Sequence, residues 1–190
     1  AHGASAGGHG LGVNYGRVAD DIPSPRRSVE LLRAAGAGSV KIYDANPGVL
    51  RALAGTRWPV SIMVPNEIIP DIAASPAAAG RWVADNLVPY YPATRVKFLL
   101  VGNEILSDYS IVNSTWTRLV PAMENIHLSL RKRGISSVKI GTTLAMDALA
   151  DGAFPRPPSA AAFRPDIAES VVRPLLHFLN GTNSYYFVDA

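Results

Sequence analysis

The sequence predicts an α/β fold in which parallel strands alternate with helices. Two observations support this prediction. Short apolar segments bounded by turn residues recur along the chain, and amphipathic segments with helix-starting residues lie between them. Consecutive strands that are joined by a helix pair in parallel through right-handed crossovers. The expected architecture is therefore a parallel sheet covered by helices.

Six strands are expected, and the fourth is the most sharply defined. Residues 96–101 form an apolar run that ends abruptly in Gly102-Asn103-Glu104. Such a run, bounded by turn residues, indicates a strand that is buried on both faces. The other expected strands, in chain order, are residues 11–13, 40–45, 60–64, 138–143 and 185–188.

Helices are expected between these strands. One begins near Pro121, and the last, over residues 167–179, should be kinked or divided near Pro174. Three others begin with a capping residue and a proline at the first helical position: Ser24-Pro25, Asn46-Pro47 and Ser75-Pro76. Glycines mark expected helix ends: Gly36, Gly55 and Gly134.

Composition limits the class of protein. The chain has 190 residues, 48% of them hydrophobic and 17% charged, which is typical of one globular domain. The absence of cysteine excludes disulfides, thiolate metal sites and a cysteine nucleophile. The net charge of +3 comes from scattered basic residues, so nucleic acid is not an expected partner. No apolar run reaches about 18 residues, so no transmembrane segment is expected.

Two sequons and the first residues of the chain suggest secretion. Asn113-Ser114-Thr115 and Asn180-Gly181-Thr182 match the acceptor pattern for N-glycosylation. Residues 1–10 are rich in small residues and are expected to be a flexible tail, such as remains after removal of a signal peptide. The tail histidines, His2 and His9, are expected to be solvated.

The pattern of strands and helices leaves two arrangements open. Six such units form either an open, doubly wound sheet or the first six of the eight in a closed barrel. The first turn, residues 12–16, is not GxGxxG, and no GxxxxGK[ST] phosphate loop occurs, so a nucleotide site has little support. There is also no GxSxG nucleophile elbow, which disfavours serine-hydrolase chemistry.

Polar residues follow the expected strands, where a barrel would build its active site. Carboxylates, amides and tyrosines, without a set of residues at metal-ligand spacing, suit a sugar site, because sugars need hydrogen bonds and aromatic faces. No metal is therefore expected. Glu104 is the candidate acid/base and Asn103 its helper. The polar strand ends are Asn14 and Tyr15, Tyr43 and Asp44, Asn66 and Glu67, Asn103 and Glu104, and Thr142 and Thr143.

Each candidate also has a structural interpretation. Glu104 and Glu67 would then be solvated loop residues, since charged residues at strand ends are common. Tyr15 and Tyr43 would be half-buried aromatic residues without a ligand, and Asp44 would cap the following helix.

The motifs, in this order and spacing, resemble the plant endo-1,3-β-glucanases of glycoside hydrolase family 17. They lie at residues 12–16, 40–45, 64–66, 101–104 and 138–143, and the segments 154–164 and 185–189 also fit. The resemblance implies a TIM (β/α)8-type barrel, of which residues 11–190 would supply only the first five to six βα units. It also implies retaining endo-hydrolysis of 1,3-β-D-glucosidic bonds in callose- or laminarin-like glucan, without a cofactor.

The resemblance assigns roles to particular residues. Glu104 would be the acid/base, and Asn103, Tyr43, Tyr15 and Asn66 would bind the glucan substrate. The nucleophile of the family, a glutamate on the seventh strand, is expected to be missing from this chain. The chain would then be the N-terminal part of a longer protein or a truncated product. The alternative is a catalytically inactive homologue that only binds β-glucan.

The resemblance also suggests a setting. Members of the family are plant enzymes of carbohydrate metabolism and defence. The protein is therefore expected to be a monomeric glycoprotein of the cell wall, or to be anchored to the membrane through a C-terminal signal that this chain does not contain.

Overall fold

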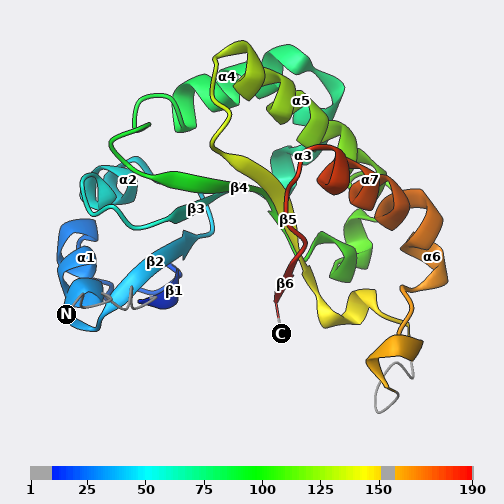
Figure 1. The fold of residues 1–190 in the computed structure, drawn as a ribbon, viewed down its shortest axis with the longest axis horizontal. Helices are drawn as coiled ribbons and strands as arrows, with labels where there is room; N and C mark the ends of the chain where they lie inside the picture. The colour runs from blue at the N-terminus through cyan, green and yellow to red at the C-terminus, as the bar shows by residue number, and fades with distance from the viewer. Residues whose placement is uncertain (1–9, 151–156, 190) are drawn as a thin grey trace, which may run out of the picture.

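A computed structural model of the protein describes residues 10–150 and 157–189 (Figure 1). The expected N-terminal tail, apart from Gly10, lies outside the described residues, as do residues 151–156 of the loop that follows the fifth strand and residue 190.

In the part of the chain that the structure describes, six strands form one parallel sheet in which every strand pairs with its neighbour in the sequence. A doubly wound sheet reverses its strand order at a switch point, and this sheet does not, so the open doubly wound alternative is wrong. The sheet curls into an arch with the helices on its outer side, which is the geometry of a partial TIM barrel (Figure 1). The strands are β1 (Leu11–Tyr15), β2 (Ala37–Ile42), β3 (Val60–Val64), β4 (Val96–Asn103), β5 (Lys139–Ala145) and β6 (Phe187–Asp189).

The helices begin where the capping residues predict. The Ser24 hydroxyl accepts a hydrogen bond from the Arg27 backbone at 3.4 Å, and the Asn46 side chain accepts one from the Val49 backbone at 3.1 Å. Ser75 caps the next long helix in the same way, which confirms all three predicted starts. The helices are α1 (Pro25–Ala34), α2 (Pro47–Leu53), α3 (Ile69–Ala74), α4 (Pro76–Asn86), α5 (Leu119–Lys132), α6 (Pro165–Ile167) and α7 (Arg173–Gly181).

Several boundaries differ from the prediction. β2 begins at Ala37, because the small residues before Val40 pair with β1 although they are weak strand formers. β2 also ends at Ile42, because the Asp44 carboxylate accepts a hydrogen bond from the Asn46 backbone at 3.0 Å and turns the chain. β4 and β5 each continue two residues beyond the expected end, to Asn103 and Ala145, and β6 begins two residues late, at Phe187.

The last helix is divided, as the sequence predicts. A π-helical segment, Ala168–Val172, separates α6 from α7 and ends two residues before Pro174. Proline has no N–H to donate to the preceding turn, so regular α-helical hydrogen bonding cannot continue through this point.

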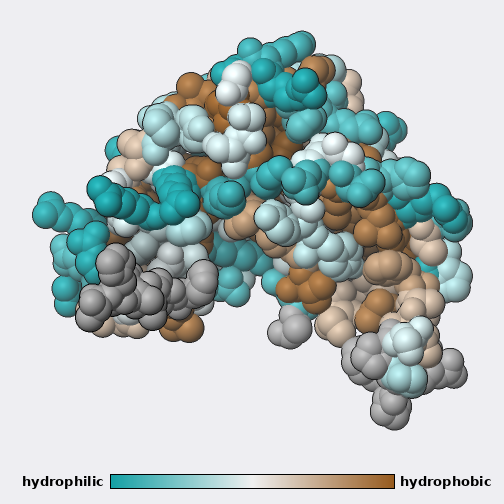
Figure 2. All heavy atoms as spheres, viewed as in Figure 1, coloured by the Kyte–Doolittle hydropathy of each residue, from teal (hydrophilic) through white to brown (hydrophobic). Residues whose placement is uncertain are grey.

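The hydrophobic core lies between the outer face of the sheet and the helices. Ile42, Ile62 and Leu99 of the sheet are fully buried there, against residues such as Leu50 and Met123 of the helices. Figure 2 shows hydrophilic residues over much of the outer rim of the arch, with a hollow between its two ends. Within the described ranges, no helix is long and apolar enough to cross a membrane.

The inner face of the curled sheet carries a different set of side chains. Because side chains alternate along a strand, Lys41 and Phe98 point away from the core that their neighbours Ile42 and Leu99 build. The Phe98 ring lies edge-on to the Phe187 ring of β6, with 5.2 Å between the centroids. The inner face therefore brings side chains of β2, β4 and β6 toward one another.

Candidate active site

A β-bulge at the end of β4 aims the Asn103-Glu104 pair. Leu100 pairs with Gly141 of β5 and Asn103 pairs with Thr143, so β4 holds one residue more than β5 between these two pairs. Gly102 lies in the bulge with a φ angle of +74°, which glycine adopts without a steric cost. Bulges re-aim side chains and are frequent beside active sites.

Asn66 holds this bulge in place. Its side-chain oxygen accepts a hydrogen bond from the Asn103 backbone N–H at 2.8 Å, and its side-chain nitrogen donates one to the Asn103 backbone oxygen at 3.0 Å. Both polar atoms of the Asn66 side chain are thus hydrogen-bonded to the backbone of Asn103. A direct contact between Asn66 and substrate stays a prediction.

Glu104 lies directly after β4 in the left-handed helical region, with φ 49° and ψ 33°. This conformation is uncommon for a residue with a side chain and costs roughly 1–2 kcal/mol. Two hydrogen bonds fix it: the Glu104 N–H donates to the Thr143 oxygen at 2.8 Å, and the Glu104 oxygen accepts from the Ser107 N–H at 3.0 Å. The carboxylate belongs to a residue of intermediate exposure, so it is open to a ligand.

A lysine on the inner face joins the site residues of three strands. The Lys41 ammonium lies 3.3 Å from the Asn103 side-chain oxygen and 3.1 Å from the Asp189 carboxylate of β6. It also lies 4.8 Å from the centre of the Tyr43 ring, over its face. Only 13% of the Lys41 side chain is exposed. Tyr43, Asn103 and Asp189 are therefore gathered around one ammonium group.

The electrostatics of Tyr43 reflect this grouping. Burial, then the Asp189 carboxylate and then the Glu104 carboxylate raise the pKa of the Tyr43 hydroxyl above its ordinary value. The hydroxyl therefore stays protonated at neutral pH and can donate a hydrogen bond. Tyr43 is 40% exposed, which leaves part of its ring accessible to a ligand.

Lys41 and Asp189 were not among the residues expected at the site. A signal for Lys41 existed, because it lies between Val40 and Ile42 in a strand and so must face away from the core. No comparable signal existed for Asp189, because its contact with Lys41 joins positions 148 residues apart.

The remaining candidates occupy different environments. Tyr15 is half-buried against the hydrophobic core, and its hydroxyl is inaccessible and without a hydrogen-bond partner among the residues described, so its role as a ligand stays a prediction. Asp44 forms an ion pair with Arg17 and caps the turn into α2. Glu67 is exposed to solvent. Within residues 10–150 and 157–189, no group of three or more His, Cys, Asp or Glu side chains is placed to hold a metal ion.

Both sequon asparagines are exposed. Asn113 lies in the turn between the short 3-10 segments Tyr109–Ile111 and Trp116–Arg118, and Asn180 lies near the end of α7. Whether either carries a glycan stays a prediction.

The curled parallel sheet, with a carboxylate and an amide delivered together at the carboxyl end of β4, is that of a partial TIM barrel with polar groups at the edge where such barrels carry their active sites. The comparisons with known proteins give the family. Residues 11–190 match the model of glycosyl hydrolases family 17, and the chain belongs to this family.

Relatives of known name support the same assignment. The chain is 47% identical over 179 residues to the probable glucan endo-1,3-beta-glucosidase A6 of Arabidopsis thaliana, covering 94% of this chain and 36% of that protein. Glucan endo-1,3-beta-glucosidase 11 of the same plant is 36% identical, with 95% and 41% covered. The solved structure of CJP38, a beta-1,3-glucanase and allergen of Cryptomeria japonica pollen, superimposes with a TM-score of 0.89 at 32% identity, covering 95% of this chain and 55% of that one. The chain thus spans about half of that structure and less of the two Arabidopsis relatives.

Proposed function

We propose that the protein cleaves internal β-1,3-glucosidic bonds of a glucan with retention of configuration, and that Glu104 is its acid/base. The observation that carries this proposal is the delivery of Glu104 and Asn103 to one point by the β4 bulge. Membership of a glycoside hydrolase family supports it, as do relatives named glucan endo-1,3-beta-glucosidases.

In this proposal Glu104 acts twice. Its protonated carboxyl donates a proton to the leaving glycosidic oxygen, and its ionised form then takes a proton from the attacking water. Because the Asn103 side-chain oxygen accepts from Lys41, the side-chain nitrogen is left to donate to a sugar hydroxyl, such as the 2-hydroxyl. Tyr43 supplies an aromatic face and a hydroxyl donor beside them.

Retention also requires a second carboxylate, roughly 5–5.5 Å from the acid/base, as the nucleophile. We assign none of the described carboxylates to this role. Because the nucleophile is unassigned, we also propose a second candidate function, which is binding of β-glucan without cleavage.

The test is hydrolysis of a laminarin-type β-1,3-glucan, with a soluble β-1,4-glucan as the control substrate, by the purified protein and by a form extended with the family's seventh strand, which supplies the nucleophile and serves as the parent protein of the variants below. We expect oligosaccharides of intermediate length from the β-1,3-glucan alone, with the β-anomer as the first product by NMR. Calorimetric binding of β-1,3-oligosaccharides without turnover would favour the second candidate. If the protein shows no binding and no turnover, both candidate functions are contradicted.

We further propose that the protein is a secreted, monomeric glycoprotein of the cell wall. The exposure of both sequon asparagines, Asn113 and Asn180, supports the glycosylation that this proposal includes. For protein purified from plant tissue, enzymatic removal of N-glycans should lower the mass, and the double variant Asn113→Gln/Asn180→Gln should show no such change. An unchanged mass of the parent protein would contradict the prediction.

A further inference from the structure

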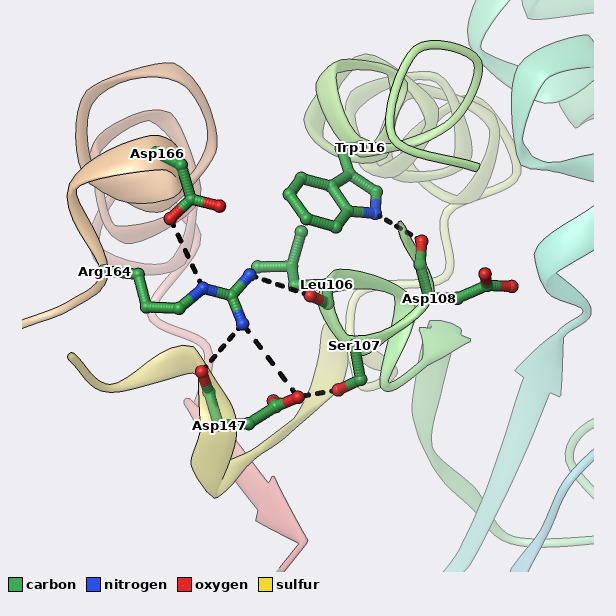
Figure 3. A network of polar contacts seen from close by, with 7 residues as sticks. All are labelled: Leu106, Ser107, Asp108, Trp116, Asp147, Arg164 and Asp166. Carbon is green, nitrogen blue, oxygen red and sulfur yellow. Dashed lines mark hydrogen bonds and ion pairs between the residues drawn. The ribbon is translucent and has the colours of Figure 1, made fainter. Parts of the chain in front are cut away.

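Arg164 is not part of the Asn103-Glu104 pair, yet its guanidinium group is the centre of a polar network (Figure 3). Only 13% of its side chain is exposed. One terminal nitrogen donates to the Asp147 backbone oxygen at 2.7 Å, and the other donates to the Leu106 backbone oxygen at 2.8 Å. The third nitrogen, Nε, donates to the Asp166 carboxylate at 3.3 Å.

These contacts join two loops at the carboxyl end of the sheet. Leu106 belongs to the 3-10 turn Ile105–Ser107, which directly follows Glu104. Asp147 belongs to the 3-10 turn Met146–Ala148, which directly follows β5. The Ser107 hydroxyl donates to the Asp147 carboxylate at 2.8 Å and adds a second connection between the same turns.

The guanidinium also organises the rest of the loop after Glu104. It lies over the Tyr109 ring at 5.2 Å and the Trp116 ring at 5.6 Å from the centroids. The Trp116 indole donates to the Asp108 backbone oxygen at 3.1 Å (Figure 3). The rings of Tyr109 and Trp116 lie edge to face. Leu106, Tyr109 and Trp116 of this loop thus all contact a single charged group.

The backbone of Glu104 depends on this loop. Its left-handed conformation persists only if the surrounding structure holds it, because a residue with a side chain would otherwise relax to a more favourable region. The Thr143 oxygen holds the N–H of Glu104, and the Ser107 N–H holds its oxygen. Arg164 binds the turn that contains Ser107 through the adjacent Leu106 oxygen.

We propose that Arg164 is a positioning residue that fixes the Glu104 carboxyl in its productive place by tying the turn after β4 to the turn after β5. This inference rests on the proposed role of Glu104 as acid/base. Arg164 is suited to the task because a planar guanidinium donates to two carbonyls at once and stacks on aromatic rings, whereas a lysine ammonium is a single point charge.

The test compares Arg164→Ala and Arg164→Lys with the parent protein in β-1,3-glucan hydrolysis. Misplacement of a reacting group by about 1 Å costs up to about 100-fold in rate, so we expect kcat to fall about 10- to 100-fold with KM nearly unchanged. Low concentrations of guanidinium ion should partly restore the kcat of Arg164→Ala and leave that of Arg164→Lys unchanged. The control is Arg26→Ala, whose side chain is 91% exposed and which should keep the parent kcat.

A second measurement follows the loop without activity. With Trp58 and Trp82 replaced by phenylalanine, Trp116 is the one tryptophan left in the sequence. Its fluorescence emission should shift to longer wavelength in Arg164→Ala, because loss of the guanidinium group exposes the indole to water. If Arg164→Ala does not fold, Arg164→Lys carries the comparison. A parent-like kcat and emission in a folded Arg164 variant would overturn the inference. If Glu104→Gln keeps full activity, the proposed acid/base fails instead, so the two failures are distinguishable.

Discussion

Replacement of Glu104 with glutamine should lower the kcat for β-1,3-glucan hydrolysis by about 10²- to 10⁴-fold, the range typical of general acid–base catalysis. Glutamine keeps the size and hydrogen-bonding capacity of the side chain but can neither donate the proton to the leaving oxygen nor accept one from water. Because Glu104 is only partly buried and its hydrogen bonds to the described residues are made by its backbone, the variant should fold as the parent does.

The chain offers a matched control at the same edge of the sheet. Glu67 lies in the 3-10 turn Asn66–Ile68 that follows β3, and it is exposed, so Glu67→Gln should keep the parent kcat. Initial rates with laminarin, together with circular dichroism to verify folding, make the comparison. A substrate with a good aryl leaving group should narrow the defect of Glu104→Gln, because such a group departs without protonation. Equal rates for Glu104→Gln and the parent protein would remove Glu104 from the mechanism.

Much of the fold could be predicted because its signals are local. The caps at Ser24, Asn46 and Ser75 depend on hydrogen bonds to residues three positions later. A continuous apolar run indicates the buried strand β4. No local signal in the sequence distinguishes a doubly wound sheet from a barrel, because strand order depends on pairing between distant segments. It was the order and spacing of the motifs, through their resemblance to a family, that predicted the barrel.

The site shows the same limit. Asn103 and Glu104 were recognisable because they follow a strand, but the contacts that orient them join positions far apart in the chain. Asn66 reaches across 37 positions to clamp the Asn103 backbone, and Lys41 reaches across 62 to its side chain. Arg164 reaches across 58 positions to Leu106. Asn66 was an expected site residue and Lys41 had a strand signal, but nothing in the sequence indicates which distant residue each of these three side chains contacts.

Gly102 carries the second large expected effect, this time on stability. A methyl group at Gly102 would come within 2.7 Å of Ile105 Cγ2 and 2.8 Å of Ile69 Cδ1, both on fully buried residues that cannot yield freely. It would also put an alanine at a φ of +74°. Backbone strain and overpacking together should lower the free energy of unfolding of Gly102→Ala by about 2–4 kcal/mol.

Two other glycines separate these causes in urea unfolding experiments. Gly55 has a φ of +73° but open space around it, so Gly55→Ala reports the backbone strain alone, about 1–2 kcal/mol. Gly80 lies inside α4 and also has open space around it, so Gly80→Ala should raise the free energy of unfolding by up to about 1 kcal/mol. The excess loss in Gly102→Ala over Gly55→Ala then measures the crowding at the bulge. Equal losses would mean that the bulge adapts, and that Gly102 is required there for its backbone conformation and not for the close approach of Ile69 and Ile105.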